Sequence, residues 1–186
     1  VLPVEIPLPG EHMVWNALAA AGVGFLMGLT PKEIQRGIGK VESVGGRSHV
    51  IPLGDGILID DCYNANPVSM KASIDVLNMA IGRKVAILGD MGELGNNEQE
   101  LHYEVGEYAA NQGIDLVCGI GPLSRSLAEG AKHAASPAQS LWFETNEDFI
   151  EALGELLRDG DNILVKASHS MRFPEIIDAL KAFSRI

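Results

Sequence analysis

Short apolar runs that alternate with amphipathic stretches constrain the fold of this chain from Lys84 onward. The runs lack polar alternation, which is typical of strands covered on both faces. They are 84–88, 115–118, 140–143 and 162–165. Helical patterns cover 102–112, 123–133, 147–158 and 174–183. Because strand and helix alternate, we expect an α/β fold with a Rossmann-like, mostly parallel sheet that is flanked by helices.

The N-terminal part follows a different pattern, which is helical. An Ala- and Gly-rich stretch at 14–29 is followed by Thr30-Pro31-Lys32-Glu33, a capping box that starts a second helix ending near Ile38. A strand pattern begins at 48–53 and returns at 57–59 after a Gly-containing turn, which predicts a hairpin. We therefore expect a domain boundary near Arg47, dividing the chain into 1–47 and 48–186.

Three helix starts carry recognisable signals. Asn66 is an expected cap and Pro67 suits the first turn of a helix that Gly82 would close. Asn146 is the expected cap of the next-to-last helix, and Pro174 opens the last one. The apolar face of the helix after Asn66 is expected to carry Met70, Ile74, Leu77 and Ile81.

The charge balance excludes one class of partner. The chain has 14 Lys and Arg against 25 Asp and Glu, a net charge of −11 that is spread along the sequence. Such a surface opposes binding to a phosphate backbone, so we expect no nucleic-acid partner.

The compartment is indicated by cysteines and by hydrophobic length. Cys62 and Cys118 lie outside any zinc or disulfide pattern, so we expect reduced thiols and no metal site. The most apolar stretch, 13–29, is too short to cross a bilayer comfortably. The start, 1–5, has no basic region typical of a signal peptide. We expect a cytoplasmic protein that does not span a membrane, and a chain that is part of something longer.

Three polar clusters follow predicted strands and therefore share one edge of the predicted sheet. The first, 60–67, holds the adjacent Asp60 and Asp61, of which one is expected to face the site and accept hydrogen bonds from ribose hydroxyls. It also holds Tyr63, which can stack on a base; an Asp- and Asn-rich turn with a helix cap is the alternative. The second, 88–95, is a glycine-rich loop with two carboxylates that does not match GxGxxG. The third, 165–172, is dense in donors that suit a carboxylate or phosphate.

Two further groups lie before the sheet. His12 and Asn16 are four residues apart and share a helix face, where they could bind a ligand or serve capping and packing. Arg47 follows two glycines, which suits a phosphate contact or simple solvation. No GxxxxGK[ST] sequence occurs, so we expect that this chain alone does not hydrolyse ATP.

Taken in order, these motifs resemble the C-terminal part of the Mur ligases. The matching segments are PGEH with Asn16, Gly46-Arg47, DDCYNANP at 60–67, LGDMGELG at 88–95 with His102, and VKASHSM at 165–171. The resemblance implies that 1–47 is the end of a central ATP-binding domain and that 48–186 is the C-terminal Rossmann-like domain. It also implies an ATP-dependent ligase of peptidoglycan synthesis that joins D-Ala-D-Ala to UDP-MurNAc-tripeptide through an acyl phosphate, with Mg²⁺ assisting.

The resemblance also implies roles for particular residues. His12 and Asn16 would approach adenine, Arg47 the phosphates, Asp61 the ribose hydroxyls, and Tyr63 with Asn64 the nucleotide. The dipeptide side would be lined by Asp90, Lys166, Ser168 and His169. ATP and Mg²⁺ would be bound mainly by the missing central domain, and no residue here would be catalytic alone, because domain closure assembles the site.

Two alternatives remain open. A related amino-acid ligase such as folylpolyglutamate synthetase shares the domain plan but should lack GDMxELG. A non-catalytic nucleotide-binding module would use the same clusters for recognition without a reaction.

Overall fold

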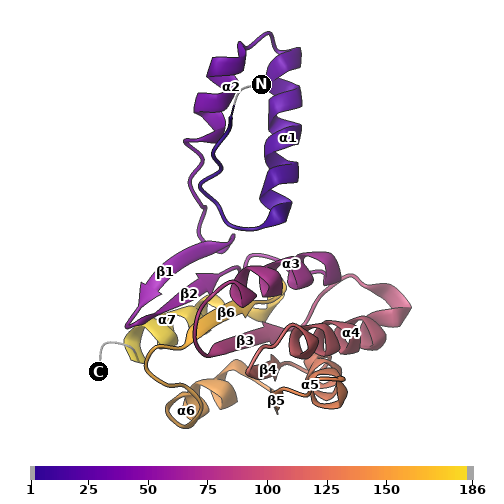
Figure 1. Ribbon diagram of the computed structural model, residues 1–186. Coiled ribbons are helices and arrows are strands. Elements are labelled where there is room, and N and C mark those ends of the chain that lie inside the picture. The colour runs from indigo at the N-terminus through magenta and orange to yellow at the C-terminus, as the bar shows by residue number, and fades with distance from the viewer. Residues whose placement is uncertain (1–2, 184–186) are drawn as a thin grey trace. The chain divides into compact units, whose positions relative to one another are not determined.

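The structure, a computed structural model, describes residues 3–183 in two compact units that divide between Val44 and Gly45. The first unit contains α1 (Glu11–Leu26) and α2 (Pro31–Ile38) (Figure 1). Thr30 N–H donates to the Glu33 carboxylate at 2.8 Å, and Glu33 N–H donates back to the Thr30 hydroxyl. The predicted capping box is therefore confirmed.

The second unit is built on a six-stranded sheet with the order β1-β2-β6-β3-β4-β5. Only β1 and β2 pair antiparallel, as the predicted hairpin, and all other neighbours run parallel. This confirms the predicted α/β fold with a mostly parallel sheet. The strands are β1 (His49–Leu53), β2 (Gly56–Asp60), β3 (Lys84–Gly89), β4 (Leu116–Ile120), β5 (Gln139–Phe143) and β6 (Asn162–Lys166).

Helices cover both faces of this sheet and create two cores. Alternate residues of β3 divide between the cores: Ala86 and Leu88 pack with α3, α4 and α5, whereas Val85 and Ile87 pack with α6 and α7. The helices are α3 (Pro67–Asn78), α4 (Glu98–Asn111), α5 (Ser124–His133), α6 (Asn146–Leu156) and α7 (Pro174–Phe183), with 3-10 turns at Gly95–Asn97 and His169–Met171.

The α4–α5 crossing is close because small residues face each other. A Cβ added at Gly106 would lie 1.8 Å from the carbonyl oxygen of Leu127, and one at Gly130 would lie 2.1 Å from that of Tyr103. Neither position has room for a methyl group without separating the helices.

Two local predictions are wrong, and one strand is less buried than its pattern suggests. The helix that Asn66 caps ends at Asn78 rather than at Gly82, so Ile81 lies beyond it and is 98% exposed. Thr145, not Asn146, caps α6, since its side chain accepts from Asp148 N–H, while the Asn146 amide donates to the Met171 carbonyl. The strand predicted at 140–143 occurs as β5, with α5 beside Ser140 on one face and Leu141 and Phe143 packed on the core of the other face, but its side chains are only partly buried.

Candidate functional site

The carboxyl ends of β2, β6 and β3 meet at a topological switch point. These strands are neighbours, yet the chain continues from β2 and β3 to α3 and α4 on one face and from β6 to α7 on the other. The loops that follow these strands therefore lead to helices on opposite faces of the sheet. Open α/β sheets bind ligands at such places. All three predicted polar clusters follow these strands.

A buried ion pair joins β2 and β6 at this point. Lys166 Nζ lies 2.5 Å from Asp61 Oδ2 and 3.0 Å from the Asn64 carbonyl oxygen, and both residues of the pair are less than a tenth exposed. Asp61 also accepts hydrogen bonds from the Ser73 hydroxyl and Ser48 N–H. The Lys166 ammonium group therefore forms its contacts within the protein. The Asp61 carboxylate, with about four acceptor positions, retains capacity for one more donor.

Exposed side chains from the loops at this edge of the sheet contact one another. The Arg47 guanidinium carbon lies 4.0 Å from the centre of the Tyr63 ring, and the His169 ring is tilted against the same ring at 5.6 Å. Tyr63 is 49% exposed, and the neighbouring Asn64 side chain is exposed as well. The structure thus brings a cation, an aromatic ring and a histidine together on the loops that follow Asp61 and Lys166.

The loop after β3 is held from three directions. The Asp90 carboxylate accepts from Ser124 N–H and the Ser124 hydroxyl, each at 2.7 Å, so it caps the start of α5. Its carbonyl oxygen accepts from Ser168 N–H. Met91 N–H donates to Nε2 of the fully buried His102, whose Nδ1 contacts the Glu98 carbonyl oxygen. Asp90 and Ser168 are therefore adjacent, but the Asp90 carboxylate is engaged in fixing the loop.

Sequence reasoning missed several of these partners. Ser73 lies in the second turn of α3, and Ser124 begins α5, which follows a different strand from the loop of Asp90. No local sequence signal indicated either partner. His102 was part of the resemblance but had no predicted role. A cleft of about 280 Å³ beside Tyr63 and His169 is also lined by Asp178 and Lys181 of α7, which no motif indicated.

His12 and Asn16 belong to the first unit. Both lie in the opening turns of α1; Asn16 is exposed, and His12 Nδ1 is covered yet has no hydrogen-bond partner among the described residues.

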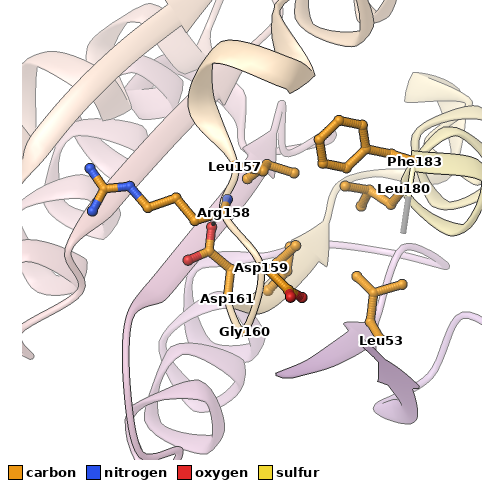
Figure 2. A pocket seen from close by; sticks show the side chains of 9 residues that line it. Leu53, Leu157, Arg158, Asp159, Gly160, Asp161, Leu180 and Phe183 are labelled. Carbon is orange, nitrogen blue, oxygen red and sulfur yellow. Dashed lines mark hydrogen bonds between the residues drawn. The ribbon is translucent and has the colours of Figure 1, made fainter. Parts of the chain in front are cut away.

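A second cavity, of about 390 Å³, is lined by none of the predicted site residues. Figure 2 shows Leu157, Leu180 and Phe183 on one side and Leu53 across from them, with the Arg158 guanidinium directed away. It opens where β6 begins, at the end of the sheet away from the three polar clusters. The two cavities therefore lie at opposite ends of β6.

The thiols and carboxylates of the described residues show no reactive or metal-binding arrangement. Burial and the hydrogen bond to Asp60 raise the pKa of the Cys62 thiol to about 12, and burial raises the pKa of Cys118 to about 12. Within residues 3–183, no three His, Cys, Asp or Glu side chains are placed to hold a metal ion. Over the same residues, no helix combines the length and apolar character needed to cross a membrane.

The open, mostly parallel sheet with helices on both faces makes this an α/β domain of the doubly wound class, in which ligands are commonly found at the switch point. Residues 46–169 match the family model of the Mur ligase, glutamate ligase domain. The chain therefore belongs to the Mur ligase family, and the predicted family is confirmed.

Named relatives narrow this to a MurF-like C-terminal region. The chain is 38% identical over 179 residues to the UDP-N-acetylmuramoyl-tripeptide--D-alanyl-D-alanine ligase of Bacillus subtilis, covering 94% of the chain and 39% of that relative. It superposes on MurF from Acinetobacter baumannii with a TM-score of 0.87 at 30% identity, covering 96% of the chain and 39% of that structure. MurF ligase from Thermotoga maritima in complex with ADP gives 0.79 at 24% identity, covering 96% and 40%. The chain thus spans about two fifths of the length of each.

Proposed function

We propose that this chain is the C-terminal portion of an ATP-dependent ligase that joins D-Ala-D-Ala to UDP-MurNAc-tripeptide through an acyl phosphate. The observation that carries the proposal is the rim at the switch point, where exposed Arg47, Tyr63 and His169 contact one another on the loops that follow the buried Asp61–Lys166 pair. Relatives at 38% identity bear this activity in their names. A nucleotide needs a cation for its phosphates and a ring for its base, and the rim offers both.

The domain assignment is part of the proposal. Residues 1–47 would end a central ATP-binding domain, and 48–186 would form the C-terminal domain. The first unit supports this, because α1 is apolar on nearly every side: Trp15, Leu18, Phe25 and Leu26 are all more than half exposed. A helix that is apolar all round is ordinarily buried, so α1 fits the core of a larger domain.

The residue roles are proposed as follows. Arg47 contacts the phosphates, Tyr63 and Asn64 contact the nucleotide, and Asp61 uses its remaining acceptor capacity for a ribose hydroxyl. From the first unit, His12 and Asn16 approach adenine; the covered Nδ1 of His12, which has no partner among residues 3–183, is consistent with a contact made elsewhere.

The dipeptide side is proposed to lie along the loops after β3 and β6. Ser168 and His169 supply donors there. The Asp90 carboxylate holds the loop after β3 against the start of α5, and Lys166 holds the loop after β2 through the Asn64 carbonyl oxygen. ATP supplies the phosphoryl group that activates the tripeptide carboxylate. Because the described residues offer no metal cluster, Mg²⁺ would be held by the phosphates and by the preceding domain. A reaction that consumes ATP also places the enzyme in the cytoplasm.

The decisive experiment is a ligase assay on the full-length parent polypeptide. ADP release should require both D-Ala-D-Ala and a UDP-MurNAc-tripeptide, tested with different third residues. Release that requires folate and glutamate instead would identify a folylpolyglutamate synthetase, and no release with either pair would favour a non-catalytic module. The 186-residue chain alone should release no ADP; turnover by it would contradict the proposed division of labour.

The role of the rim is tested by substitution in the same assay. Arg47→Ala should raise the ATP KM about tenfold or more, because it removes charge-assisted hydrogen bonds to phosphate. Lys132→Ala, a change of an exposed cation in the last turn of α5, is the matched control and should leave the KM unchanged. Equal values for the two variants would refute the nucleotide role of Arg47.

A further inference from the structure

Two adjacent aspartates fasten the backbone on either side of Arg47. Asp60 Oδ2 accepts from Gly46 N–H at 3.2 Å, and Asp61 Oδ1 accepts from Ser48 N–H at 2.8 Å. The Gly46 carbonyl oxygen in turn accepts from Tyr63 N–H at 2.9 Å. The segment Gly46–Ser48 is therefore attached to the loop after β2 at three points, and Arg47 lies in the middle.

This clamp follows from strand geometry. Successive side chains at the end of a strand point to opposite sides, so Asp60 and Asp61 can reach different atoms of one passing segment. Asp60 is 9% exposed, and its other oxygen accepts from the Cys62 thiol at 3.0 Å and from Cys62 N–H. Both oxygens of Asp60 are thus used within the protein, although the side chain borders the cleft beside Tyr63.

The clamped segment has an unusual backbone on both sides of Arg47. Gly46 has φ +75°, and a Cβ there would lie 3.3 Å from both N and Cβ of Tyr63. Ser48 has φ +48°, which is uncommon for a residue with a side chain. Such conformations persist where surrounding contacts hold the backbone in place. Here the Asp60 and Asp61 carboxylates do so by accepting hydrogen bonds from the Gly46 and Ser48 N–H groups.

We propose that Asp60 is a positioning residue that acts through Arg47, holding its guanidinium over Tyr63 and ready for an anionic group of the ligand. The identification of this anionic group as a nucleotide phosphate rests on the proposed function, whereas the clamp itself does not. The clamp reduces the number of conformations that Arg47 must give up on binding, and such preorganisation increases affinity. Asp60 itself makes no contact with the ligand.

The first test uses the 186-residue chain and needs no ligand. NMR relaxation of the Arg47 Nε–Hε group, together with the shift that the Tyr63 ring imposes on the Arg47 side chain, reports how firmly Arg47 is held. Asp60→Ala and Gly46→Ala should each increase the motion and reduce the ring shift. Asp60→Asn, which keeps an acceptor, should preserve most of both. Gly45→Ala is the matched control, because a Cβ there meets nothing within 4 Å.

Unchanged resonances from β3 and β4 show that each variant remains folded. If Asp60→Ala unfolds the chain, Gly46→Ala breaks the same clamp from the other side and decides the matter. Arg47 dynamics that are the same in Gly46→Ala, Gly45→Ala and the unmodified chain would overturn the proposal.

The second test is a double-mutant cycle on the ATP KM of the parent enzyme. Asp60→Ala should raise this KM about tenfold, the equivalent of one hydrogen bond to a charged group. Once Arg47 is replaced by Ala, adding Asp60→Ala should change the KM less than twofold, because the two residues act as one. A double variant that shows the product of the two single effects would mean that Asp60 contacts the ligand directly, and would refute the inference. An unmodified parent that forms no amide bond would refute the proposed function, while the NMR test would still decide on the clamp.

Discussion

Replacing Lys166 with Met removes the buried ammonium group that neutralises Asp61. The ion pair is 2.5 Å long, and only 3% of the Lys166 side chain and 11% of the Asp61 side chain are exposed. Methionine retains most of the aliphatic stem, so the change tests the charge more than the packing. After the substitution, Asp61 keeps hydrogen bonds from Ser73 and Ser48 but has no cation.

The expected cost is about 3 kcal/mol in the free energy of unfolding. Breaking a buried pair by removing one partner costs about 3–5 kcal/mol, because the other charge is left in a poorly solvated place. We expect a loss at the lower end of this range, because the Ser73 hydroxyl and Ser48 N–H still donate hydrogen bonds to the Asp61 carboxylate. Against a total stability of about 5–15 kcal/mol, this loss is large but can be measured. Asp61→Asn combined with Lys166→Met leaves no buried charge and should be more stable than Lys166→Met alone.

Urea unfolding at pH 7, followed by tryptophan fluorescence, measures this. Trp142 reports on the second unit, since its indole N–H donates to the Gly121 carbonyl oxygen, and a Trp15→Phe background removes the signal of the first unit. Lys71→Met is the matched control: its pair with Glu104 spans 3.6 Å and both side chains are at least a third exposed, so the loss should be below about 1 kcal/mol. Equal losses for Lys166→Met and Lys71→Met would refute the description of a buried pair.

Four further predictions concern the scaffold of the second unit. Gly106→Ala should destabilise it by about 2 kcal/mol or more in urea titrations, because the α4–α5 contact must open, whereas Gly154→Ala, in an exposed part of α6, should be neutral or stabilising by up to about 1 kcal/mol. His102→Leu should cost about 1–3 kcal/mol in the same titrations, since Met91 N–H loses its acceptor, and His102→Gln should cost less. Cys118, with its pKa raised to about 12 by burial, should resist iodoacetamide at pH 8 in the native chain and react fully in denaturant; rapid native labelling would contradict its burial. The hydrogen bond to Asp75, followed by burial, raises the pKa of Tyr108 to about 12, so it contributes stability that is present below pH 10 and lost as the pH rises toward about 12; Tyr108→Phe should abolish that part of the alkaline decline in thermal stability.

The elements that the sequence predicted correctly depend on local chemistry. The capping box at Thr30 and the cap at Asn66 involve residues three apart, and both occur in the structure. The apolar runs became strands because a fully apolar segment of that length is stable where both faces are covered. The run at 140–143 also became a strand, but the order of strands across the sheet, which no local pattern encodes, places β5 at the edge, where its side chains are only partly buried.

The candidate site divides in the same way. Each polar loop directly follows a predicted strand in the sequence, and the carboxyl ends of parallel strands share one edge of a sheet. This was enough to predict that Asp61, Asp90 and Lys166 lie at the same edge. The sequence near each residue did not indicate which of these side-chain atoms are free to bind a ligand and which are bonded within the protein. Lys166 meets Asp61 across 105 residues of chain, and Asp90 meets Ser124 across 34, so their partners depend on how separate segments pack.

Periodicity and the positions of the polar loops determined the α/β architecture and the edge of the sheet that carries the polar groups, and the resemblance of the motifs to the Mur ligases indicated the family. Tertiary structure decided that Asp90 and Lys166 fix loops, that Asp60 and Asp61 fasten the segment around Arg47, and that Arg47, Tyr63 and His169 form the exposed surface. The physical reason is that burying an unpaired charge is costly, so each buried charged group forms its ion pair or hydrogen bonds with whichever groups the fold places beside it. Only polar groups that have no such partner within the protein are available to bind a ligand.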